Sequence, residues 1–235
     1  MTETTVVTID KTPYSHKIQN SMHTAKKRFK KIKAVLFDLD GVLIDSYIAW
    51  FNQFNETLKH FGHEPICEKK FRKHWGQSTE DDVRIFMPER TLDEVRQYFA
   101  DHHEEYASHL KINPEAKDIL EKLKNMKLKL GCVTNSHRAI VKQILTSLKL
   151  IKFFHVIVTA DDVKKPKPAP DMLLKACKLL RVTPTQTIFL GDTIIDLKAG
   201  KNASCVVIGF MIKSHNEVSS LAEFLDLVQS NFHHT

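Results

Sequence analysis

Short apolar runs recur along the chain from Lys33 onward, and longer amphipathic stretches separate them. The first run, Ala34-Val35-Leu36-Phe37, is of the kind found in strands buried on both faces of a parallel sheet. Runs of similar character follow at 129–133, 155–158, 187–190 and 205–208. The stretches at 139–148, 171–180 and 193–201 have the spacing of amphipathic helices. Strands alternating with helices predict right-handed βαβ units, and therefore an α/β fold with a doubly wound parallel sheet.

One interval breaks this alternation directly after the first strand. Residues 47–111 contain no convincing strand and are expected to form helices, including 47–60, 80–86 and 92–109. An all-helical insertion at this point predicts a small cap domain over the ligand-binding edge of the sheet. The expected organisation is a leader at 1–32, a core at 33–46 and 112–235, and a helical cap at 47–111.

Composition is consistent with one globular enzyme-sized unit. The 235 residues are 42% hydrophobic and 27% charged, which is ordinary for a soluble protein. No apolar run approaches the roughly 18 to 20 residues of a membrane span, and the N-terminus lacks the pattern of a secretory signal. The four cysteines have neither metal-ligand spacing nor the pattern of a disulfide framework. A cytoplasmic location is the expectation.

Most of the net charge of +7 lies at the N-terminus. Residues 1–33 contain eight lysines and arginines against two acidic residues, so they carry +6 of it. Such a basic segment can contact nucleic acid or an anionic membrane surface, although basic runs alone are weak indicators and a flexible, solvated leader explains the run equally simply.

Polar residues follow the predicted strands, at the edge where parallel sheets bind ligands. The first strand is followed by Asp38, Asp40 and Gly41, and the fourth by Asp192. Further members of this set are Thr134, Asn135 and Ser136 after the second strand, Lys167 in a proline-rich loop after the third, and Asp196 one turn into the helix after Asp192. Carboxylates, hydroxyls and a lysine at one edge indicate a phosphate held beside a hard divalent cation.

Each residue has a chemical role in such a site. Mg²⁺ is usually held by one or two carboxylates and substrate phosphate, which Asp38 and Asp192 can supply, with Asp196 acting from further out. The Asp38 carboxylate can attack phosphorus, and Asp40 can protonate the leaving oxygen and then activate water. Thr134 can donate a hydrogen bond to a phosphoryl oxygen, and Lys167 can place a positive charge on it.

Four ordered motifs resemble those of the haloacid dehalogenase superfamily, in particular its phosphatases with a helical cap after the first strand. The motifs are Asp38-Leu39-Asp40-Gly41-Val42, Val133-Thr134-Asn135-Ser136, Lys167-Pro168-Ala169-Pro170-Asp171 and Gly191-Asp192-Thr193-Ile194-Ile195-Asp196. They cover roughly residues 33–212. The resemblance implies a Rossmann-like core, a nucleophilic Asp38 and an acid/base Asp40. It also implies Mg²⁺ held by Asp38, the backbone carbonyl of Asp40, and Asp192. Thr134, Asn135 and Lys167 are then expected to bind substrate, with Gly41 and Asp196 in supporting positions.

Several alternatives remain open at this point. Within the superfamily the motifs are most similar to phosphoglycolate phosphatases and related pyrophosphatases, so a small phosphorylated metabolite is the expected substrate. A phosphomutase would use the same residues, whereas a dehalogenase would have no need of Asp40. An alternative outside the enzymes is a non-catalytic binding protein that uses its basic leader to contact nucleic acid or lipid.

Individual residues also have alternative interpretations. An isolated Asp after a strand can simply cap a helix, and Asp196 can simply complement a helix dipole. Lys165 precedes a Pro-x-Pro sequence just as Lys167 does. Asp45 and Ser46 are expected to cap the first cap helix, outside the site. The segment at 75–78 is expected to be either a substrate-contacting loop or an ordinary turn.

Overall fold

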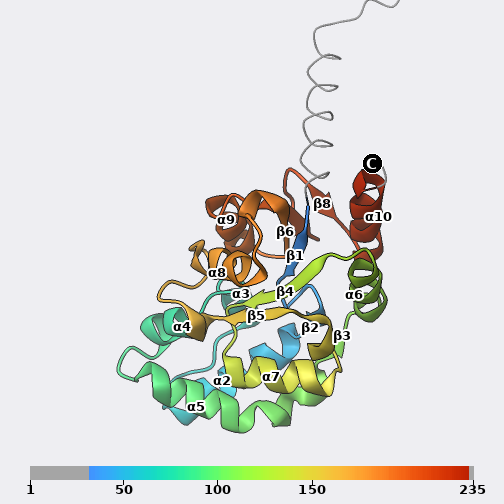
Figure 1. Cartoon of the computed structure of the whole chain (residues 1–235). Coiled ribbons are helices and arrows are strands. Elements are labelled where there is room, and N and C mark those ends of the chain that lie inside the picture. The colour runs from blue at the N-terminus through green and yellow to red at the C-terminus, as the bar shows by residue number, and fades with distance from the viewer. Residues whose placement is uncertain (1–31, 233–235) are drawn as a thin grey trace, which may run out of the picture.

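The structure, a computed structural model, describes residues 32–232. It consists of a parallel sheet flanked by helices (Figure 1). Its six strands lie in the order β5-β4-β1-β6-β7-β8 and all pair in parallel. They are β1 (Ala34–Phe37), β4 (Lys129–Thr134), β5 (Val156–Thr159), β6 (Thr187–Gly191), β7 (Val206–Phe210) and β8 (Glu217–Val218). The α/β class and the Rossmann-like parallel sheet expected from the sequence are confirmed.

The core helices cover both faces of the sheet. In Figure 1, α8 and α9 lie on one side and α6 and α10 on the other. The bounds of the core helices are α6 (Ala116–Asn125), α7 (Arg138–Ser147), α8 (Asp171–Leu180), α9 (Ile194–Asn202) and α10 (Leu221–Phe232). Three short 3₁₀ turns also belong to the core: η2 (Ile151–Phe153), η3 (Ala160–Asp162) and η4 (Pro184–Gln186). Within the described residues, no helix is both long and apolar enough to cross a membrane.

Strand β1 explains why the first apolar run shows no polar alternation. Val35 and Phe37 pack in the core cluster that contains the buried faces of α6, α7 and α10. Ala34 and Leu36 point the other way, into the cluster formed with α8 and α9. All four side chains are fully buried, as expected for a strand covered on both faces.

A helical insertion, defined here as residues 47–109, separates the first strand from the rest of the sheet. It contains α2 (Tyr47–His60), α3 (Glu68–Arg72), α4 (Thr79–Phe86), α5 (Leu92–His102) and η1 (His103–His109). A two-stranded antiparallel ribbon of β2 (Ile44–Asp45) and β3 (Lys111–Ile112) joins its ends. Helices were expected over 47–60, 80–86 and 92–109, and each expectation agrees with the structure.

Helix α2 illustrates how the insertion is held together. Its buried residues include Ala49, Gln53, Phe54 and Leu58, which recur at helical spacing along one face. Phe54 packs against the rings of Phe71 in α3 and Phe86 in α4, with centroid separations of 5.6 and 5.2 Å. The aromatic contacts tie three helices that are individually too short to be stable alone.

The basic leader expected at residues 1–32 lies outside the described residues, apart from Ile32. That side chain is buried in the core beside the first strand, and the Lys33 amide donates to the carbonyl of Gln186 at 2.8 Å. These contacts attach the segment just before β1 to the core.

Candidate active site

The polar residues predicted from the sequence gather at the carboxyl ends of β4, β1 and β6, which are neighbouring strands. Asp38 follows β1, Thr134 ends β4 and Asp192 follows β6. Because parallel strands all end at the same edge of a sheet, residues nearly 160 positions apart in the chain come into contact. The loop after β5 adds Lys167.

Lys167 forms the centre of the charged group. Its ammonium nitrogen Nζ lies 2.7 Å from Oδ1 of Asp38, 2.7 Å from Oδ1 of Asp196 and 3.1 Å from the carbonyl oxygen of Val133. The Lys167 side chain is only 2% exposed. Burial disfavours its charged form, but the carboxylates of Asp196 and Asp38 outweigh this and raise the pKa of Lys167 above its ordinary value. Lys167 therefore stays protonated.

The structure distinguishes the two lysines that precede Pro-x-Pro. Lys167 points into the site, whereas Lys165 is exposed. The backbone of Lys167 is fixed by Asn135, whose side-chain oxygen accepts from its amide at 3.0 Å and whose side-chain nitrogen donates to its carbonyl at 2.9 Å. These bonds hold the loop after β5 against the end of β4.

Asp38 is 94% buried and surrounded by charge. Burial raises the pKa of its carboxyl well above the usual range, Lys167 opposes this shift, and the carboxylates of Asp196, Asp192 and Asp40 reinforce it. In the same way, burial and the Asp196 carboxylate raise the pKa of Asp192 to about 7. A cluster of acids this dense calls for more positive charge than one lysine provides.

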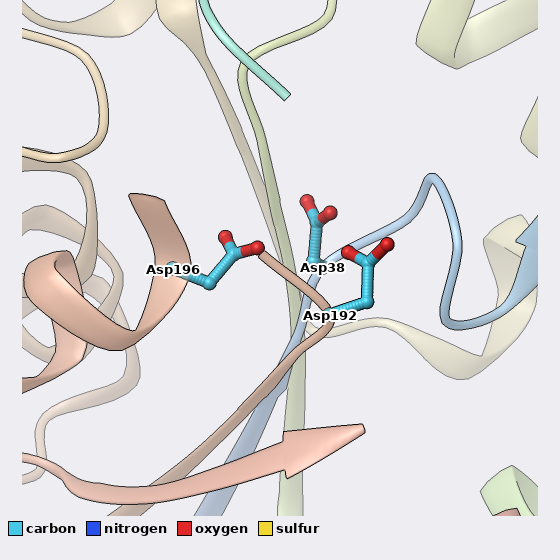
Figure 2. Close-up of side chains that lie close together, drawn as sticks. All are labelled: Asp38, Asp192 and Asp196. Atoms are coloured by element: carbon cyan, nitrogen blue, oxygen red, sulfur yellow. The ribbon is translucent and has the colours of Figure 1, made fainter. Parts of the chain in front are cut away.

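The three carboxylates of Asp38, Asp192 and Asp196 lie close together (Figure 2). One oxygen from each lies within 4.8 Å of the others. Both oxygens of Asp196 are already engaged, one with Lys167 and one with Thr193 at the start of α9. Oδ1 of Asp192, by contrast, is a buried oxygen that lacks a hydrogen-bond partner among the described residues.

This donor set fits a hard divalent cation. Mg²⁺ prefers oxygen ligands and usually takes one or two protein carboxylates, and Asp38 with the unpartnered Asp192 oxygen can supply them. Gly41 makes this approach feasible, since a Cβ atom at that position would lie 2.0 Å from Oδ2 of Asp192 and its φ is +82°. Asp196 instead closes the capping box of α9 while it holds Lys167.

Asp40 is held by four donors that reach it from both sides. Its Oδ1 accepts from the Ser46 hydroxyl at 2.6 Å and from the indole nitrogen of Trp50 at 2.9 Å. Its Oδ2 accepts from the hydroxyls of Ser136 at 2.8 Å and Thr134 at 3.3 Å. The carboxyl group is therefore oriented jointly by the insertion and by the sheet edge.

Two of these partners were not expected from the sequence to act in the site. Ser46 is the N-cap residue of α2, but its side chain makes no capping bond and donates to Asp40 instead. The expectation that Ser46 only caps the helix is wrong, because its hydroxyl donates a charge-assisted hydrogen bond to the Asp40 carboxylate and accepts none from the backbone amides of α2. Trp50 lies four residues further along the same helix face, and this spacing is the one sequence signal that could have indicated it.

The loop Trp75-Gly76-Gln77-Ser78 reaches from the insertion to the sheet edge. The Gly76 carbonyl accepts from the side chain of Asn135 at 3.0 Å. The indole nitrogen of Trp75 lies 3.4 Å from Oδ2 of Asp192. A Cβ at Gly76, whose φ is +84°, would come within 2.9 Å of the Thr193 side chain. The loop is thus a contact between insertion and core and more than a turn between helices.

Together these groups line a cleft between the insertion and the sheet. Asp38, Asp40, Thr134, Asn135 and Lys167 lie along its sheet side. Five aromatic residues, His74, Gln77, Thr79 and Asp82 lie along its insertion side; the aromatic ones are Trp50, Phe54, Phe71, Trp75 and Phe99. The enclosed part of the cleft has a volume of about 70 Å³, and the rest of the cleft is open to solvent.

Comparison with known proteins places this arrangement in a family. Residues 35–210 match the model of the haloacid dehalogenase-like hydrolases. The chain is 34% identical to "Pyrophosphatase PpaX" of Bacillus mycoides over 176 residues, or 74% of this chain and 80% of that protein. It is 28% identical to "Phosphoglycolate phosphatase" of Chromobacterium violaceum, over 86% of this chain and 98% of the relative.

The fold has close counterparts among solved structures. A crystal structure described as a putative phosphoglycolate phosphatase from Lactobacillus plantarum superposes with a TM-score of 0.74, covering 83% of this chain and 99% of that one. At 22% identity this likeness concerns the fold alone.

Proposed function

The chain belongs to the haloacid dehalogenase-like hydrolase family, and we propose that it is a Mg²⁺-dependent phosphatase in which Asp38 carries the phosphoryl group between a small phosphomonoester and water. The observation that carries the proposal is the convergence of Asp38, Asp40 and Lys167, from two segments far apart in the chain, in one cleft. Phosphoryl transfer depends mainly on positioning and charge stabilisation, and these three groups offer both.

The first half of the reaction uses Asp38 and Asp40. A carboxylate oxygen of Asp38 attacks phosphorus, the bond from phosphorus to the leaving oxygen breaks, and Asp40 gives that oxygen a proton. Lys167 compensates charge on the Asp38 carboxyl and on the incoming phosphate, which it can reach from its position 2.7 Å from Asp38. When bound, Mg²⁺ supplies further positive charge on the phosphoryl oxygens. The product is an alcohol and an aspartyl-phosphate.

The second half regenerates the enzyme. Asp40, now without its proton, takes one from water, and the water oxygen attacks phosphorus to release phosphate and restore Asp38. Ser46, Trp50 and Ser136 hold the Asp40 carboxyl between the sheet and the insertion, where it can serve both halves. Thr134 is proposed to donate to the phosphate. Substrate contact by Asn135 stays a prediction, since its side chain binds the Lys167 backbone and Gly76.

The names of the relatives suggest two candidate substrates. The sequence motifs favour a phosphoglycolate-like phosphomonoester, and one relative is called a phosphoglycolate phosphatase. Pyrophosphate is a second candidate because the relative with 34% identity is called a pyrophosphatase. The phosphate end of the cleft suits either, so the choice depends on the insertion side.

A test of the chemistry uses the purified full-length protein and a generic aryl phosphate. We expect hydrolysis with Mg²⁺, no hydrolysis with a chelator, and none in Asp38→Asn. In Asp40→Asn, quenched single-turnover samples should contain phosphorylated protein, because water is no longer activated. The matched control is Asp45→Asn, the same change at an exposed position seven residues on, which should keep full activity. Full activity in Asp38→Asn would contradict the proposal.

A further inference from the structure

The insertion side of the cleft is mostly apolar. Phe54, Phe71 and Phe99 are almost completely buried, and with Trp50 and Trp75 they form a wall of aromatic rings opposite the phosphate end. The rings pack on one another, with centroids 5.6 Å apart for Phe54 and Phe71 and 5.8 Å for Trp50 and Phe99. Such a wall excludes water and favours an apolar group beside the phosphate.

Positive charge is confined to the other side of the cleft. Among the described residues that line it, Lys167 is the only lysine or arginine, and its Nζ is bound to Asp38, Asp196 and a backbone carbonyl. Nearby basic residues of the insertion face outward. Arg84, for example, pairs with Asp81 on the surface with 69% of its side chain exposed. A carboxylate or second phosphate placed at the insertion side would meet no lysine or arginine among the described residues, and His74 is the one residue lining that side that can carry a positive charge.

Asp82 makes the same side unfavourable to anions. Its Oδ1 accepts from the side-chain nitrogen of Gln77 at 2.5 Å, and none of the described cations forms an ion pair with it. Burial raises the pKa of Asp82 to about 8, so the carboxyl is largely protonated at neutral pH. It then offers a neutral hydrogen bond to the ligand, and when ionised it repels a negative charge.

We propose that the group released from phosphate in this cleft is an uncharged alcohol with an apolar face, and that leaving groups bearing a carboxylate or phosphate are poor substrates. This inference rests on the proposed function, because it assigns the organic half of the same phosphomonoester. The phosphorus–oxygen bond to that alcohol breaks, and Asp40 supplies its proton. The preference for phosphoglycolate that the sequence motifs favour is thereby set aside for this chain.

The test compares phosphomonoesters of unactivated alcohols at saturating Mg²⁺. The alcohol part of benzyl phosphate carries an aromatic ring. That of n-propyl phosphate is close to glycolate in size but has no charge, and that of phosphoethanolamine has a positive charge. We expect kcat/KM to fall in the order benzyl, n-propyl, phosphoglycolate, with at least about a tenfold step between the last two, equal to about 1.4 kcal/mol. Pyrophosphate should be as poor as phosphoglycolate.

Each result decides between the alternatives. A higher kcat/KM for phosphoglycolate or pyrophosphate than for n-propyl phosphate would overturn the inference while leaving the phosphatase proposal intact. A higher value for phosphoethanolamine than for benzyl phosphate would also overturn it, in favour of a cationic leaving group. If none of these esters nor an aryl phosphate is hydrolysed, it is the proposed function that fails.

A charge-gain variant sharpens the test. Thr79 lines the cleft at the first turn of α4, so Thr79→Lys should place an ammonium group where none stands in the wild type. We expect the ratio of kcat/KM for phosphoglycolate to that for n-propyl phosphate to rise about tenfold. Thr185→Lys, the same change at an exposed site on the core, should leave that ratio unchanged. An unchanged ratio in folded Thr79→Lys would contradict the inference, and if that variant does not fold, the wild-type series decides.

Discussion

The sheet edge and the helical insertion meet across one cleft, and they differ in how each treats charge. At the sheet edge, the ammonium group of Lys167 binds Asp38 and Asp196 at 2.7 Å each, and all three side chains are almost completely buried. On the insertion side, aromatic rings dominate, and the neutral Gln77 is the one hydrogen-bond partner of the Asp82 carboxyl among the described residues. The sheet edge is organised to hold and transfer a charged group, whereas the insertion is organised to exclude one.

This difference follows from how the two regions are built. The loops after parallel strands are short and meet by topology, so a few polar residues suffice to assemble a charged site. The insertion is held by side-chain packing between short helices, and its inner face is therefore apolar by default. Chemistry and leaving-group selection are thus carried by separate parts of the chain and can be changed separately.

Removing the lysine should disturb the sheet edge most. Lys167→Met leaves Asp38 and Asp196 buried without their cation, and breaking such a pair typically costs roughly 3–5 kcal/mol of folding free energy. We also expect kcat to fall at least about 100-fold, since a fixed positive charge beside the phosphate is lost. Chemical unfolding and steady-state kinetics measure the two effects.

Lys165→Met is the matched control, because this lysine is exposed two positions earlier. It should change stability by less than about 0.5 kcal/mol. A larger loss of activity in Lys165→Met than in Lys167→Met would show that the wrong lysine has been assigned.

Metal binding should stabilise the sheet edge and leave the insertion side unaffected. At a Mg²⁺ concentration about 100 times the Kd, the free energy of unfolding should rise by about 2.7 kcal/mol, and a chelator should reverse the gain. In Asp192→Asn, which loses the oxygen without a partner, the gain should largely vanish. Thermal unfolding with and without Mg²⁺ measures it, with Asp226→Asn as an exposed control. An equal gain in wild type and Asp192→Asn would rule out Asp192 as a ligand.

The contact between the two regions at Asp40 can be weakened without losing the aromatic wall. Trp50→Phe keeps a ring but removes the 2.9 Å hydrogen bond to Asp40, so we expect kcat to fall about tenfold with little change in preference among leaving groups. Trp75→Phe, which loses only a 3.4 Å contact to Asp192, should have a smaller effect. The reverse order would mean that the Trp50 bond does not position the acid/base group.

The insertion side should respond most to pH through Asp82. Its carboxyl keeps its proton in the folded state up to about pH 8, whereas in the unfolded chain it loses the proton near pH 4. The folded state therefore binds more protons between these values, and stability falls as pH rises, by at most about 1.4 kcal/mol per unit. The slope should be smaller than this limit because the carboxyl faces an open cleft.

Asp82→Asn lacks this titration, so its stability should gain on that of the wild type as pH rises from about 5 to about 8. Urea unfolding at several pH values measures the difference. Parallel stability curves for the two proteins would show that the Asp82 carboxyl is well solvated.

Much of the fold could be predicted from local pattern. Helix α2 spans 47–60 as expected, and β4 and β6 each extend only one residue beyond their predicted ends. Strands buried on both faces appear in the sequence as continuous apolar runs, and amphipathic helices as apolar residues at helical spacing. The ribbon of β2 and β3 and the edge strand β8 are two residues long, which is too short to produce a periodic signal. The N-cap position of Ser46 could be predicted too, but its bond to Asp40 could not.

The sequence by itself determined the class of the fold and the set of chemical groups at the sheet edge, because each group directly follows an apolar strand and parallel strands end together. The tertiary structure decided what those groups contact. Packing between segments 129 residues apart, Lys167 against Asp38, selects Lys167 over Lys165. The start of α2, 6 to 10 residues after Asp40, brings Ser46 and Trp50 to the acid/base group. The tertiary structure also decided that, among the described residues, the far side of the cleft carries five aromatic side chains and no lysine or arginine, since that surface is assembled from several short helices whose sequences do not specify how they pack together.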